Sequence, residues 1–173
     1  MVVILHETCE PEARSDARGL YLDMIVRVET LRAVRERAGL TQAELAVLSG
    51  VAQPNIAAYE SGTRPLSSRM RHRLTQAMTR PSERVAGQRE RVREIVVRNR
   101  GRDPRLFGSV ARGEDRPGSD LDLLVDLDDS ASLFDLARMH LELEELLGIK
   151  VDVLDEKGLR DKHRGIVDDA VPL

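Results

Sequence analysis

One stretch, residues 108–125, constrains this chain more than any other. A Gly-Ser pair, Gly108 and Ser109, follows a short apolar run, and ten residues later Asp120 and Asp122 open a run of Leu and Val that predicts a buried strand. Alternation along a strand places both aspartates on one face. Because neighbouring carboxylates repel each other unless a cation lies between them, the pair predicts a site for hard cations.

The Gly-Ser pair adds a second chemical requirement to the same stretch. Gly108 allows a backbone to approach phosphate oxygens closely, and Ser109 adds a hydroxyl at an expected helix N-terminus. The alternative interpretation is a glycine-rich loop followed by an acidic strand edge. The length of the combined pattern favours a site for metal ions and a triphosphate.

This stretch resembles the signature of the minimal nucleotidyltransferases, small members of the DNA polymerase beta-like superfamily. The residues that match are Gly108, Ser109, Ala111-Arg112-Gly113-Glu114 and Ser119-Asp120-Leu121-Asp122. The resemblance implies that Asp120 and Asp122 hold two Mg²⁺ ions, which bind the triphosphate of ATP and activate an incoming hydroxyl.

The same resemblance implies roles for further residues. The family has a third carboxylate on the next strand, and Asp152, in the alternating run of residues 149–154, matches that place. Its implied role is to ligate the metal on the hydroxyl side and to help take the proton. Gly108 and Ser109 would hold the phosphates, and Arg112 would offset their charge. Taken alone, Asp152 also fits a surface residue on an edge strand.

Charge divides the chain into two unlike halves. Residues 27–104 hold 16 Arg and 8 acidic residues, whereas residues 105–173 hold 9 basic and 17 acidic residues, within a net charge of -3. A basic half joined to an acidic half predicts two modules with different partners. The basic half favours nucleic acid.

The basic half also carries a helix-turn-helix pattern. Helices are expected over residues 42–49 and 53–61, separated by Ser49-Gly50-Val51, and Thr41 with Glu44 forms a capping box. Gly-Leu-Thr-Gln-x-Glu-Leu-Ala, followed by Ser-Gly-Val and Ile-x-x-Tyr-Glu-x-Gly, resembles the lambda-repressor/Cro-like family. The resemblance covers roughly residues 28–79, with Leu45, Ala46, Val51 and Ile56 as the expected core.

In such domains the second helix enters the major groove of DNA. Gln53 and Asn55 lie at the N-terminal end of that helix and are expected to meet base edges, while Gln42 and Arg64 are expected to touch phosphates. The alternative is that these are solvated polar residues on a protein-binding bundle. DNA binding is favoured because the motif and the local positive charge agree.

The predicted architecture has two domains. An all-α helix-turn-helix bundle at 27–80 precedes a small α+β nucleotidyltransferase fold at 81–173, with a mixed sheet of three or four strands. Residues 1–26 are expected to form a weakly ordered leader, and Met24 is a candidate start. After Pro81 a helix is expected to run to about residue 100, capped by Ser82 and ended by Gly101. A second helix is expected at 133–147, with Leu133 on its core face, and a last one at 159–167. Strands are expected at 105–107, 120–127 and 149–154.

Other patterns exclude several classes of protein. The single cysteine, Cys9, excludes an internal disulfide framework and fits a reducing cytoplasm, and the apolar run at residues 2–5 is too short for a signal peptide or a membrane span. No zinc site is expected, because the four histidines are scattered without ligand spacing: His6, His72, His140 and His163.

Taken together, the resemblances imply an antitoxin. Minimal nucleotidyltransferases often silence HEPN-type ribonuclease toxins by transferring AMP from ATP to a tyrosine hydroxyl, and a fused helix-turn-helix suits binding to operator DNA and autorepression. A homo-oligomer or a complex with the toxin is expected. Two alternatives stay open: a DNA-binding regulator whose transferase domain only binds a partner protein, and an enzyme that acts on a small molecule, as aminoglycoside nucleotidyltransferases do.

Overall fold

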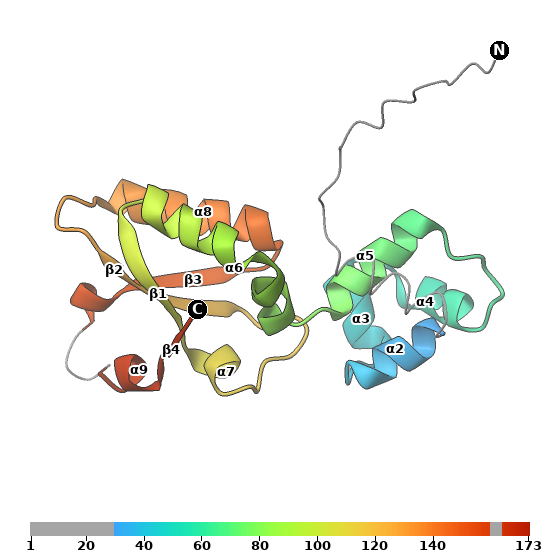
Figure 1. Cartoon of the computed structure of the whole chain (residues 1–173). Helices are drawn as coiled ribbons and strands as arrows, with labels where there is room; N and C mark the ends of the chain where they lie inside the picture. The colour runs from blue at the N-terminus through green and yellow to red at the C-terminus, as the bar shows by residue number, and fades with distance from the viewer. Residues whose placement is uncertain (1–29, 160–163) are drawn as a thin grey trace, which may run out of the picture.

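The structure, a computed structural model, describes residues 30–159 and 164–173 of the 173-residue chain. The expected leader at 1–26 lies outside the described residues, as do Met24, Cys9, His6 and His163. Figure 1 shows a helical bundle on one side and a sheet covered by helices on the other. No helix among the described residues is long and apolar enough to cross a membrane.

The N-terminal part is a bundle of short helices: α2 (Leu31–Arg37), α3 (Gln42–Ser49), α4 (Gln53–Glu60) and α5 (Ser68–Met78). The capping box at the start of α3 is present, since the Thr41 side chain accepts from the Glu44 backbone while the Glu44 carboxylate accepts from the Thr41 backbone. Gly50 ends α3 in the left-handed conformation (φ 62°), which glycine adopts without strain. Leu45, Val51 and Ile56 are buried and Ala46 packs against them, as the sequence predicts.

The C-terminal part combines helices with a four-stranded sheet in the order β3-β2-β1-β4. Its elements are α6 (Pro81–Arg98), β1 (Gly101–Leu106), α7 (Gly108–Ala111), β2 (Leu121–Leu127), α8 (Leu133–Leu147), β3 (Val151–Asp155), the 3₁₀ turn η1 (Glu156–Gly158), α9 (Arg164–Asp169) and β4 (Val171–Pro172). Strands β2 and β3 are parallel, and β1 is antiparallel to both β2 and β4, so the predicted mixed sheet is confirmed. Helices α6 and α8 lie side by side on one face of it (Figure 1).

The buried side chains form two separate clusters. One lies inside the bundle, between Leu31 and Met78. The other cluster joins α6 and α8 to the sheet, and Val85 of α6 is its first residue in the sequence. Helix α6 therefore belongs by its packing to the C-terminal part. The division near Pro81 is consistent with this packing and stays a prediction.

Two expected helix boundaries are wrong. Ser82 does not cap α6, because Pro81 already occupies the first turn and Arg80 is the N-cap residue. Gly101 does not end that helix but begins β1. The reason is close packing: a Cβ at Gly101 would lie 2.8 Å from Val96 Cγ1, so the strand runs directly beneath the helix.

The expected face of α8 is also corrected at its start. Leu133 is 83% exposed, because it lies in the first turn, whereas the buried residues Met139, Leu143 and Leu147 come from later turns. At the C-terminus, the helix expected at 159–167 does not begin at Leu159, which has an extended backbone after η1; residues 160–163 lie outside the described residues, and α9 begins at Arg164. It is followed by β4, a short strand that the sequence analysis did not identify.

Candidate active site

The three predicted carboxylates lie at the beginning of two neighbouring parallel strands. Asp120 directly precedes β2, Asp122 is the second residue of β2, and Asp152 is the second residue of β3. The strand register pairs Asp122 with Asp152. Because side chains at paired positions of parallel strands project from the same face, the structure brings these carboxylates to one place.

Gly108 lies against the central carboxylate of this group. Its φ of +64° favours glycine, and a Cβ there would lie only 2.1 Å from Asp122 Oδ2. The backbone N–H of the preceding residue, Phe107, donates to the Asp122 carbonyl at 3.1 Å. These contacts hold the start of α7 beside β2. A side chain at Gly108 would displace the carboxylate.

Sequence reasoning missed one member of the site, Lys150. Its Nζ lies 2.8 Å from Asp120 Oδ2 and 3.6 Å from Asp152 Oδ2. The hydrogen bond to Asp120 raises the pKa of this lysine. The signal was present in the sequence, since alternation places residues 150 and 152 on the same side of the strand.

The charge of Asp122 is poorly stabilised. Burial raises the pKa of its carboxyl, and the negative charges of Asp152 and Asp120 raise it further. A cation at this position would relieve the repulsion, and aspartate oxygens are the donors that Mg²⁺ prefers. Among residues 30–159 and 164–173, no three His, Cys, Asp or Glu side chains come close enough to hold one ion, and Lys150 pairs with two of the three carboxylates. The donor chemistry fits a hard cation that replaces this lysine.

The loop after α7 is held by its own contacts. Arg112 is exposed, and its Nε lies 2.8 Å from Glu114 Oε2. The Glu114 backbone N–H donates to the Ser109 carbonyl at 2.8 Å. Asp115, a second residue that sequence reasoning missed, is only 3% exposed and accepts from the Ser82 backbone N–H at 2.9 Å. Arg112 therefore lies on a defined loop that directly follows α7, the helix that carries Ser109.

The residues assigned to DNA bases and one assigned to phosphate lie at the surface of the bundle. Gln53 is exposed at the start of α4. Asn55 Oδ1 accepts from Arg64 at 2.9 Å, and the Arg64 guanidinium lies 5.6 Å from the ring centroid of Tyr59. The structure thus brings Asn55 and Arg64 together. Their contacts with DNA stay a prediction.

Gln42 has an internal partner that the sequence analysis did not foresee. Its Nε2 donates to Glu60 Oε2 at 2.9 Å, and Arg35 donates to both oxygens of the same carboxylate at 2.7 and 3.0 Å. Burial alone would raise the pKa of Glu60, but hydrogen bonds from Arg35 and Gln42 outweigh it and lower the pKa. Gln42 therefore helps to hold the bundle together, whatever it contacts outside it.

Comparison with protein families identifies both parts of the chain. Residues 28–86 match the family described as a helix-turn-helix domain. Residues 89–172 match the family described as a nucleotidyltransferase domain. These two matches follow the same order as the helical bundle and the sheet-containing part.

Individual relatives agree with the second match. A region of 68 residues is 37% identical to the protein adenylyltransferase MntA of Thermococcus cleftensis and covers 39% of this chain and 69% of that protein. Another of 60 residues is 45% identical to a Methanocaldococcus jannaschii protein that bears the name protein adenylyltransferase, covering 35% of this chain and 64% of that protein. The chain thus spans less than two thirds of the length of this relative, and 59% of a second one from the same organism.

A solved structure shows the same fold for the C-terminal part. It is described as a minimal nucleotidyltransferase and superimposes with a TM-score of 0.50 at 44% sequence identity. The match covers 53% of this chain and 95% of that chain. This match therefore leaves almost none of the solved chain, and nearly half of this chain, without a counterpart.

Proposed function

The chain belongs to the minimal nucleotidyltransferase family and carries a helix-turn-helix domain ahead of the transferase domain, and from this premise we propose that it transfers AMP from ATP to a hydroxyl of a partner protein. The observation that carries the proposal is that the strand register pairs Asp122 with Asp152, while Asp120 lies two residues before Asp122, directly before β2. Carboxylates that lie this close together repel one another and so do not stabilise the fold, whereas a bound cation would be attracted to all of them.

In this proposal Asp120, Asp122 and Asp152 hold two Mg²⁺ ions. When bound, such ions would neutralise the triphosphate and make the attacking hydroxyl more acidic. The remaining steps belong to the chain itself. Gly108 and Ser109 bind phosphate oxygens, and Arg112 offsets their charge. The acceptor oxygen bonds to the α-phosphorus while the bond from the α- to the β-phosphate breaks, so that pyrophosphate leaves, and Asp152 accepts the hydroxyl proton.

We propose a tyrosine of a HEPN-type toxin as the acceptor and the cytoplasm as the compartment. The name of the relative MntA, a protein adenylyltransferase, supports a protein acceptor. The helix-turn-helix domain supports a second activity, binding of operator DNA and repression of the chain's own operon, by a homo-oligomer or by a complex with the toxin. Gln53, Asn55 and Arg64 would contact this DNA, with Gln42 near its backbone.

The direct test of transfer uses purified protein, Mg²⁺, ATP labelled at its α-phosphate, and the product of the neighbouring gene. We expect label on a tyrosine of that partner, and no label with Asp122→Asn. Label that appears on a small molecule and never on protein would support the aminoglycoside-like alternative instead.

One observation favours a second candidate function. Lys150 already neutralises Asp120 and Asp152, as would suit a transferase domain that has lost catalysis and only binds a partner. The two candidates differ in their response to Lys150→Gln. If the chain is an enzyme, this variant binds Mg²⁺ at least as tightly as the wild type and still labels the partner. A regulator without catalysis labels nothing in either form but still binds the partner and DNA.

The DNA-binding part has its own test. Binding to the DNA upstream of the gene should weaken steeply as salt increases, because phosphate contacts release counterions. Gln53→Ala combined with Asn55→Ala should lower the affinity for that DNA by about tenfold or more. An unchanged affinity would show that α4 is not the helix that reads DNA.

A further inference from the structure

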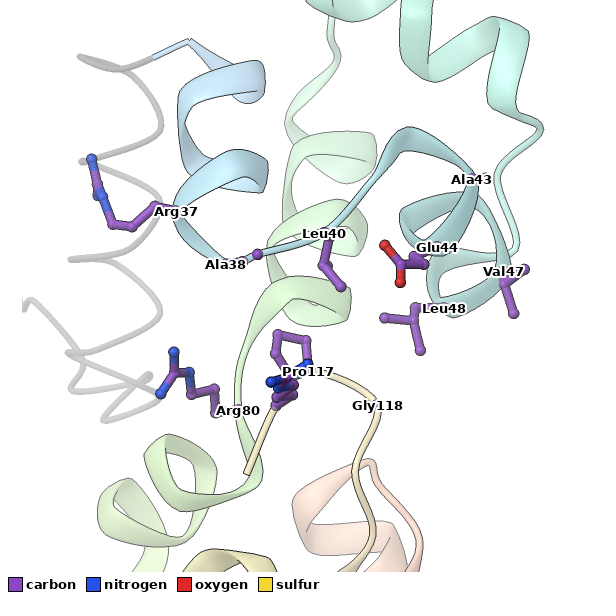
Figure 2. A pocket seen from close by; sticks show the side chains of 12 residues that line it. Arg37, Ala38, Leu40, Ala43, Glu44, Val47, Leu48, Arg80, Pro117 and Gly118 are labelled. Atoms are coloured by element: carbon purple, nitrogen blue, oxygen red, sulfur yellow. The ribbon is translucent and has the colours of Figure 1, made fainter. Parts of the chain in front are cut away.

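A cavity of about 690 Å³ lies between the helical bundle and the loop that leads into β2. One wall comes from the end of α2, the following turn and α3, and the other from Arg80 and the loop residues 116–118. Figure 2 shows Leu40, Glu44 and Leu48 on one side and Pro117 opposite them. Ligand pockets typically enclose roughly 300–1,000 Å³ and favour domain interfaces, so the size and place fit a small molecule.

The lining combines an apolar surface with positive charge. Leu40, Leu48 and Pro117 supply apolar walls that suit a flat ring. Three arginines line the cavity, Arg37, Arg80 and Arg116, against a single carboxylate, that of Glu44. That carboxylate already accepts hydrogen bonds of 2.7 Å from the backbone and the hydroxyl of Thr41. The lining thus carries more positive than negative charge, and this excess suits an anion.

One close contact joins the two walls of the cavity, and hydrogen bonds nearby hold the groups around it in place. Gly118 (φ +88°) lies so close to α3 that a Cβ there would be 2.5 Å from Leu48 Cδ2. The Asp115 carboxylate accepts from the Ser82 backbone at 2.9 Å. Arg84 donates to the Leu147 carbonyl at 2.8 Å and also to the Gln76 carbonyl, and so joins the last turns of α8 and α5. The cavity is thus framed by packed and hydrogen-bonded groups.

From these features we propose that the cavity is a second ligand site, which binds a nucleotide-class anion: a flat apolar ring joined to one or more phosphate groups. The ring packs on Leu40, Leu48 and Pro117, and the phosphates pair with Arg80 and Arg116. None of the carboxylates of the candidate active site lines the cavity, so this ligand is held without their metal ions. Because residues 116–118 lead directly to Asp120, an occupant contacts both the bundle and the active-site loop.

The test measures binding by calorimetry with the full chain in EDTA, which removes divalent metals and so silences the proposed active site. The probe is ADP, with adenosine and inorganic pyrophosphate as its separate halves. Two variants alter the cavity: Ala43→Phe, which fills it from an exposed position of α3, and Arg116→Ala. Arg91→Ala, an exposed arginine on α6 away from the cavity, is the matched control, and the melting temperature of each variant confirms folding.

We expect saturable binding of one ADP per chain, at least tenfold weaker binding of adenosine and pyrophosphate, and at least a tenfold loss with either cavity variant. Arg91→Ala and Asp122→Asn should bind ADP as the wild type does. The absence of ADP binding in EDTA, or binding that survives both cavity variants, would overturn the proposal. So would loss of binding with Asp122→Asn alone, which would place the ADP at the active site. Since no transfer is measured, the result does not depend on the proposed function.

Discussion

The helical bundle and the transferase part use charged residues in opposite ways. In the bundle, Glu60 is surrounded by donors from Arg35 and Gln42, and these lower its pKa. At the start of β2, Asp122 lies beside two further carboxylates, and its pKa is raised. Charge in the bundle is therefore paired and stabilises the fold, whereas the carboxylates at the start of β2 repel one another, as the proposed cation site requires.

The largest expected effect on stability comes from breaking the paired charge in the bundle. Glu60→Ala leaves the guanidinium of Arg35 buried without its carboxylate, and we expect a loss of about 3 kcal/mol in the free energy of unfolding. Urea unfolding followed by circular dichroism measures it. Glu90→Ala is the control, because Glu90 pairs with Arg93 at an exposed position of α6 and should change stability little. Equal losses of unfolding free energy in the two variants would mean that the buried ion pair stabilises the fold no more than an exposed one.

A smaller effect on stability is expected at Gly108, where the backbone approaches the Asp122 carboxylate. Gly108→Ala forces a residue with a Cβ into positive φ, at a cost of about 1 kcal/mol, and also displaces the Asp122 carboxylate. Gly113→Ala is a matched control, because Gly113 has a similar φ of +69° and nothing within 4 Å of the added Cβ. We expect both variants to lose stability and only Gly108→Ala to lose AMP transfer. Equal transfer by both would mean that the contact with Asp122 is irrelevant to function.

Lowering the pH should change the stability of the bundle by a still smaller amount, through Glu60. Because the folded-state pKa of Glu60 lies below its ordinary value of 4.5, its contribution is complete above that value and is lost as the pH falls through the folded pKa. The melting temperature of the bundle should therefore fall faster below pH 4.5 in the wild type than in Glu60→Gln. Parallel curves for the two proteins would show that Glu60 does not carry this dependence.

The smallest effect is expected at Lys150, which is exposed on β3 beside two carboxylates. Lys150→Gln should leave the melting temperature almost unchanged and increase the affinity for Mg²⁺ several-fold, because the competing ammonium is gone. Calorimetric titration with MgCl₂ measures this affinity. A weaker affinity in the variant would mean that Lys150 supports metal binding rather than competing with it.

Local signals in the sequence predicted most of the fold. The capping box of Thr41 and Glu44 predicts the start of α3, and Ser49-Gly50-Val51 predicts the break after it, and the structure confirms both. Strand alternation alone grouped Asp120 with Asp122, whereas Asp152 was added to them by the resemblance to the nucleotidyltransferase family. What failed was local too: Ser82 was a plausible cap, but Pro81 had already fixed where α6 begins.

Contacts between distant residues could not be predicted in this way. Arg35 and Glu60 are 25 positions apart, and their pairing depends on how α2 and α4 cross. Lys150 reaches Asp120 only because β2 and β3 adopt one particular register. The cavity between the two parts depends on the packing of Leu48 against Gly118, which no periodicity encodes.

The central claim, that the carboxylates of Asp120 and Asp122 serve function and not the fold, is tested most directly by Asp120→Asn combined with Asp122→Asn. One preparation of this variant is examined for AMP transfer to the partner and for its melting temperature without Mg²⁺. We expect transfer to vanish, while the melting temperature stays the same or rises slightly, because the repulsion is removed and the side-chain shape is kept. Transfer that persists, or a protein that no longer folds, would contradict the account.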